Sequence, residues 1–196
     1  MNVQLINAQT DFHVWAETYD QKLTDVFSVE SEIAKRIADS LQAKLTAREE
    51  QAIATKPTNN SEAYDAYLRG LAFDARSDVF SFAGYSQHLL DKAVGLYERA
   101  VQLDPNFTVA WARLARANAL LYFNRYDDHS KPDILRDAAK NALETVQQLE
   151  PNSPQTALAL GYYQYWVQLD YGTAKITFDR VSKMLPGTGE IGRAHV

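Results

Sequence analysis

The sequence predicts a mainly α-helical fold built from repeated helix pairs, and three observations lead to this class. In the first, Ala93, Tyr97 and Ala100 follow helical spacing, and Pro105 comes five residues after the last of them. The second is that this frame recurs twice further along the chain. The later copies are Ala139, Leu143, Val146 and Pro151, and then Ala174, Phe178, Val181 and Pro186. The third is that apolar residues keep a helical period from Ser61 onward.

Composition sets the limits within which a function must lie. The chain of 196 residues is long enough to bury a core. With 46% hydrophobic and 23% charged residues, its composition is not that of a disordered protein. The net charge of −5 argues against a surface that binds nucleic-acid phosphates. The absence of cysteine excludes disulfides, thiolate metal ligands and cysteine nucleophiles. No apolar run approaches the length of a membrane span, so we expect no membrane insertion by this chain and a cytoplasmic location by default. A periplasmic location is the alternative if the parent protein has a transmembrane segment.

The N-terminal quarter of the chain predicts a different kind of structure. Residues 2–7 and 13–19 alternate as two short strands of a hairpin, and 24–45 follow a helical period. A single hairpin is marginal alone, so we expect the chain to begin inside a domain. A short helix at 46–54 and a polar linker at 56–60 then lead into the helical region.

Six further helices form three antiparallel pairs, and each pair is followed by a turn led by a proline. The expected helices are 62–76, 84–103, 108–124, 133–149, 154–168 and 171–184. The frame is irregular, because 46 residues separate Pro105 from Pro151 whereas 35 separate Pro151 from Pro186. The extra residues are expected either in loops at 77–85 and 123–132 or in longer helices.

This frame resembles the tetratricopeptide repeat (TPR), whose usual period is about 34 residues. The matching residues are Gly70, Phe73, Ala93, Tyr97, Ala100 and Pro105 in the first unit, Trp111, Leu114, Ala115, Ala139 and Pro151 in the second, and Leu160, Gly161, Ala174, Phe178 and Pro186 in the third. The resemblance implies a right-handed superhelical array over 61–186. Its units would be 61–106, 107–152 and 153–186.

The segment 1–56 carries a second resemblance. The runs 3–11, 13–20 and 25–34 are similar to the C-terminal end of a TolB-like α/β domain, which precedes TPR arrays in bacterial signalling proteins. The resemblance implies a fragment of a larger protein with an upstream effector in the same polypeptide, such as an adenylate or guanylate cyclase, a kinase or a winged-helix domain. Residues 191–196 are similar to the translation of a common sequencing adapter, so we interpret 190–196 as an artefact.

Motifs for catalysis or cofactor binding are missing from the sequence. No phosphate-cradling glycine loop and no His-Glu-x-x-His run occurs. Asp127, Asp128 and His129 could hold a metal ion, although a solvated loop is the favoured interpretation. We therefore predict that the chain is not an enzyme and has no catalytic residues, metal site or cofactor.

The TPR resemblance also implies where a partner would bind. In such arrays the first helix of each pair lines a concave groove. The residues at groove positions are Tyr64, Tyr67, Leu71, Asp74, Arg113, Arg116, Gln155, Tyr162 and Tyr165. Tyrosine and arginine are favoured interface residues, so a peptide with some acidic character is the expected ligand. The competing interpretation is that several of these tyrosines pack between repeats.

The leading hypothesis is therefore a protein-interaction scaffold that acts as a regulatory or sensory module of a larger bacterial signalling protein. The alternative is an accessory region of an adenylate cyclase or transcriptional regulator whose catalytic or DNA-binding domain lies outside this sequence. Neither hypothesis has this chain bind nucleic acid.

Overall fold

The computed structural model describes residues 2–7, 11–18, 26–40, 55–79, 83–125 and 132–184. Contacts divide the chain into two compact units, Met1–Ser61 and Glu62–Val196. The short helix predicted at 46–54, the acidic loop with His129 and the tail at 190–196 all lie outside the described residues.

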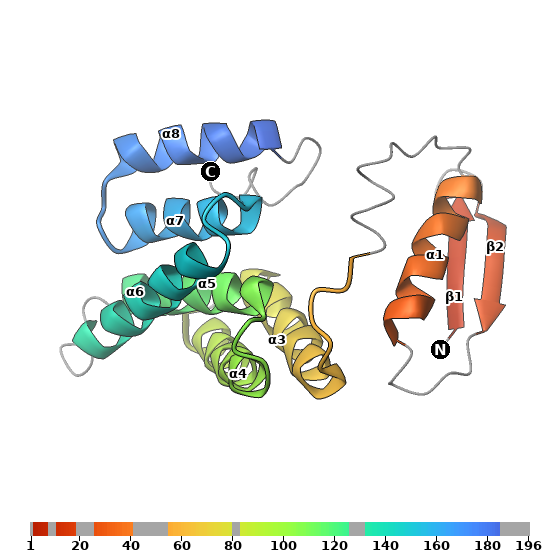
Figure 1. The fold of residues 1–196 in the computed structure, drawn as a ribbon, viewed down its shortest axis with the longest axis horizontal. Helices are drawn as coiled ribbons and strands as arrows, with labels where there is room; N and C mark the ends of the chain where they lie inside the picture. The colour runs from red at the N-terminus through yellow and green to blue at the C-terminus, as the bar shows by residue number, and fades with distance from the viewer. Residues whose placement is uncertain are drawn as a thin grey trace. The chain divides into compact units, whose positions relative to one another are not determined.

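The first unit contains the predicted hairpin and helix (Figure 1). Strands β1 (Asn2–Asn7) and β2 (Phe12–Thr18) pair antiparallel, with Leu5 opposite Trp15 and a register shift after Leu5. Helix α1 (Val26–Ser40) is linked to β2 by the ion pair between Arg36 and Glu17. Ile6 and Val14 of the strands remain 46% exposed.

The described part of the second unit consists of helices joined by turns. Its helices are α3 (Ser61–Val79), α4 (Ala83–Leu103), α5 (Thr108–Asn124), α6 (Pro132–Leu149), α7 (Pro154–Trp166) and α8 (Tyr171–Met184). Helix α5 packs against α4, α6 and α7, and α7 packs against α8 (Figure 1). The six predicted helices are confirmed. The predicted loop at 77–85 is shorter at both ends, because α3 runs on to Val79 and α4 begins at Ala83, so both helices are longer, as the sequence also allowed.

The recurring small and aromatic residues are the core of these helix pairs. Tyr97 on α4 and Phe178 on α8 are fully buried, and each ring lies against a glycine of the preceding helix. A Cβ atom built on Gly70 would lie 2.6 Å from Cε1 of Tyr97, and one on Gly161 would lie 2.6 Å from Cε1 of Phe178. The glycines are therefore required for the close approach of the paired helices.

The helix starts differ in how they satisfy their first backbone N–H groups. The Ser153 hydroxyl accepts a hydrogen bond from the Thr156 N–H at 3.1 Å and caps α7. Asp170 caps α8 by accepting from the backbone N–H and the hydroxyl of Thr173, and these bonds hold the pKa of Asp170 below its usual value. At α5 the cap position is Phe107, which has no side-chain bond and is instead fully buried.

We expect Ser153→Ala to lower the free energy of unfolding by about 1 kcal/mol, because it leaves a first-turn N–H without its cap. The substitution leaves the Thr156 hydroxyl with a partner, because that hydroxyl donates to the Glu150 carbonyl oxygen at 2.7 Å. Urea denaturation would measure the change. Ser182→Ala is the matched control, because this exposed hydroxyl donates within α8 and caps nothing. Equal effects of the two substitutions would contradict the capping role.

Candidate functional site

The nine predicted groove residues lie on α3, α5 and α7, the first helices of the three pairs. Their exposure differs widely. Tyr64, Asp74 and Tyr162 are buried, Tyr67, Leu71, Arg113, Arg116 and Tyr165 are half-buried, and Gln155 is exposed. The structure brings most of them into a buried ion pair and two aromatic clusters.

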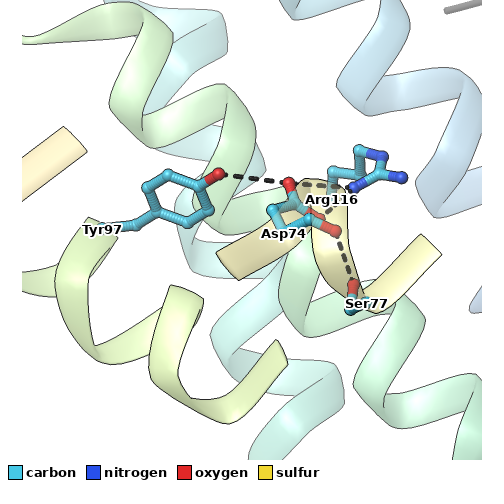
Figure 2. Close-up of polar contacts among 4 residues, drawn as sticks. All are labelled: Asp74, Ser77, Tyr97 and Arg116. Atoms are coloured by element: carbon cyan, nitrogen blue, oxygen red, sulfur yellow. Dashed lines mark hydrogen bonds and ion pairs between the residues drawn. The ribbon is translucent and has the colours of Figure 1, made fainter. Parts of the chain in front are cut away.

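The ion pair joins α3 to α5. Nη1 of Arg116 donates to both carboxylate oxygens of Asp74, at 2.8 and 3.1 Å, and the two side chains are only 12% and 4% exposed. The Tyr97 hydroxyl on α4 donates to Oδ2 of Asp74 at 3.1 Å (Figure 2). The Ser77 hydroxyl donates to the backbone carbonyl of Asp74 at 2.7 Å. One carboxylate therefore links three helices in a largely buried environment, where removal of a partner is costly.

Tyr97 is fixed in its neutral, donating form. Its pKa lies well above the usual value, first because burial disfavours the phenolate and then because the charge of Asp74 repels it. Among the described residues, no buried side-chain nitrogen or oxygen lacks a hydrogen-bond partner. The network is therefore satisfied, as a stable buried polar cluster must be.

Arg116 also contacts α7 through the face of its guanidinium. Its Cζ lies 5.1 Å from the ring centre of Tyr162 and 5.8 Å from that of Trp166. These two rings stack on each other with centres 4.5 Å apart. Asp74 thus offsets the charge of Arg116, and aromatic rings cover its plane. The predicted contact between Arg116 and an acidic ligand stays a prediction, whereas the structure places this side chain in contacts within the unit.

A first aromatic cluster explains the burial of the tyrosines on α3. The ring centre of Phe107, at the next turn, lies 6.5 Å from that of Tyr64 and 5.1 Å from that of Tyr67. The ring centre of Tyr67 also lies 6.1 Å from that of Tyr97. These tyrosines pack between successive helix pairs, which is the competing interpretation that the sequence left open.

The second aromatic cluster leaves more surface accessible. Tyr165, Trp166 and Tyr171, here called the aromatic shelf, surround the end of α7 and the start of α8. The ring centres of Tyr165 and Tyr171 lie 4.9 Å apart, and those of Tyr165 and Trp166 lie 6.3 Å apart. Tyr171 is 53% exposed, and the other two are half-buried. Trp166 was not among the predicted groove residues, although its spacing of four from Tyr162 places both on one helix face.

The described residues contain no group of three or more His, Cys, Asp or Glu side chains that could hold a metal ion. In the same part of the chain, no helix is long and apolar enough to cross a membrane. The candidate site described above consists of aromatic and polar side chains of α3, α5, α7 and α8.

Comparison with known proteins gives one informative match. No family model matches the chain, and no solved structure matches it. The chain is 29% identical over 168 residues to "Putative adenylate cyclase 3" of Rhizobium meliloti (strain 1021). The aligned region covers 86% of this chain but 27% of that protein. The chain thus spans about a quarter of the length of this relative, and its mainly helical fold is compatible with a helical repeat protein.

Proposed function

We propose that the helical unit is a TPR-type interaction module that binds a peptide or protein partner along α3, α5 and α7. The aromatic shelf is the observation that carries this proposal. Tyrosine and tryptophan bring large contact area together with a polar tip, and they are enriched where binding energy is concentrated. The recurring frame and the glycine–aromatic contacts at Gly70 and Gly161 support the array.

The contacts of Arg116 change the expected chemistry of the ligand. With Asp74 paired to it at 2.8 Å, this arginine adds little net charge to the surface. The other predicted groove cation, Arg113, lies close enough to Tyr97 to lower the pKa of that hydroxyl against the larger opposing effects of burial and of Asp74. We infer that the partner is recognised chiefly by apolar and aromatic side chains, with acidic residues of secondary importance.

The place of this module in a larger protein is the second part of the proposal. The match to a protein named as a putative adenylate cyclase supports a signalling context, in which the module is an accessory region of a cyclase or regulator. The hairpin and α1 would then be the end of a TolB-like domain. Partner binding to the helical unit would alter the position or assembly of an effector domain in the same polypeptide.

We expect the double substitution Tyr165→Ala and Tyr171→Ala to weaken partner binding at least about 10-fold, which corresponds to ~1.4 kcal/mol. The immobilised chain would first capture a partner, and biolayer interferometry would then measure affinity for each variant. Ile176→Ala on α8 is the control, because Ile176 is 72% exposed and lies outside the shelf. Charge reversal at Arg116 is unsuitable, since it would place a second carboxylate beside Asp74.

Two results would count against the proposal. One is that the shelf variant, folded by circular dichroism, binds as tightly as the original chain. The other is that the control loses affinity equally. Turnover of a nucleotide by the purified chain, with no protein partner recovered, would favour a catalytic function instead.

A further inference from the structure

Two turns of the helical unit both begin with the dipeptide Pro-Asn, but the residue six positions after the proline differs between them. Pro105-Asn106 precedes α5, and Pro151-Asn152 precedes α7. The sixth residue after the proline is Trp111 in the first case and Ala157 in the second. Nε1 of Trp111 donates a hydrogen bond to the Pro105 carbonyl oxygen at 2.8 Å. An indole of the chain therefore lies against the first turn.

A cavity lies at the second turn. Its volume is about 200 Å³, and it is lined by Pro151, Asn152, Ser153, Ala157, Arg180 and Met184. This equals the liquid volume of several water molecules at about 30 Å³ each, so the cavity has room for an aromatic ring. Ala157 is 5% exposed and lines the cavity, and it stands at the sequence position that the larger Trp111 has at the first turn.

The chemistry of the lining fits an aromatic guest. Met184 offers a flexible, polarisable side chain that adapts to a flat ring. Arg180 is an exposed cation that can lie over a ring face. The Pro151 carbonyl stands at the position whose counterpart, on Pro105, accepts from an indole N–H. None of the nine predicted groove residues lines this cavity.

We propose that this cavity is a second binding site, which receives the indole of a tryptophan that a partner protein exposes on its surface. The bound indole lies against Pro151 in the way that Trp111 lies against Pro105. Its N–H donates a hydrogen bond to the Pro151 carbonyl oxygen. Arg180 covers the ring from the rim. The site is separate from the aromatic shelf, so it does not depend on binding along α3, α5 and α7.

The test uses the full chain, labelled with ¹⁵N, and N-acetyl-tryptophanamide as the probe. Titration followed by amide chemical shifts should show saturable changes at Asn152, Ala157 and Met184. The expected dissociation constant is on the order of 1 mM, as for a single small fragment. N-acetyl-alaninamide should produce no saturable change at these residues.

Ala157→Trp places the chain's own indole in the cavity and should weaken probe binding at least 10-fold. Ile176→Trp is the matched control, because it adds a tryptophan at a 72% exposed position and should leave probe binding unchanged. Arg180→Ala serves if Ala157→Trp fails to fold, and a severalfold loss of affinity is expected for it.

Absence of saturable shifts at the cavity would overturn the proposal, including the case in which the chain's own residues already fill the space. Full probe binding by a folded Ala157→Trp variant, or by the Arg180→Ala variant, would overturn it as well. The shelf variant Tyr165→Ala and Tyr171→Ala should bind the probe normally. A failure of the cavity and a failure of the proposed groove are therefore distinguishable.

Discussion

Asp74→Ala should lower the free energy of unfolding of the helical unit by about 3–5 kcal/mol, the usual cost of removing one partner from a buried ion pair. Arg116 would keep its charge at a site where its side chain is 12% exposed. The Tyr97 hydroxyl, which donates to the same carboxylate, would lose its acceptor as well. Urea denaturation followed through amide signals of α3, α5 and α7 would measure this unit separately from the hairpin and α1.

A variant without either charge separates this effect from simple loss of packing. Asp74→Leu combined with Arg116→Met fills the same space with apolar atoms and should cost far less than Asp74→Ala alone. Asp74→Asn should fall between them, because its amide oxygen can still accept from Tyr97 or Arg116. A loss below about 1 kcal/mol for Asp74→Ala would contradict a buried, satisfied network.

The helix pairs could be predicted because their determinants are local. Helix α5 spans Thr108–Asn124 and α8 spans Tyr171–Met184, and the sequence predicted the same limits for both. A proline turn before one helix and a capping aspartate before the other mark these starts. Helix α3 runs three residues further than predicted. Within this extension Ser77 donates to the Asp74 carbonyl, a local bond that a helix tolerates but that also favours turns.

The environment of the predicted groove residues could not be derived in the same way. Asp74 and Arg116 are 42 residues apart in the sequence. No rule of helical spacing pairs a carboxylate with a guanidinium over such a sequence separation. Tyr64 is buried because Phe107 reaches it from the following turn, so its exposure depends on how two helix pairs pack. The repeat frame assigns the groove positions to α3, α5 and α7, and this assignment stays a prediction. Only tertiary contacts decide which side chains remain accessible.

The close approach of paired helices leads to the second large effect. Gly161→Ala should lower the free energy of unfolding by about 1–3 kcal/mol, even though alanine is the better helix former. Its Cβ would lie 2.6, 2.9 and 3.1 Å from three ring atoms of Phe178. That ring is 2% exposed and packs edge-on against Tyr162 at 5.2 Å, so it has little room to move away. Thermal and urea denaturation would measure the loss.

Gly95→Ala on α4 is the matched control, because a Cβ there would have nothing within 4 Å. This exposed helical glycine should show the opposite sign, with a gain of about 0.5–1 kcal/mol from reduced backbone entropy. Phe178→Leu should cost less in the Gly161→Ala background than alone, because a smaller side chain relieves the clash. Stabilisation by both glycine substitutions would refute the packing argument, since helix propensity alone would then explain both results.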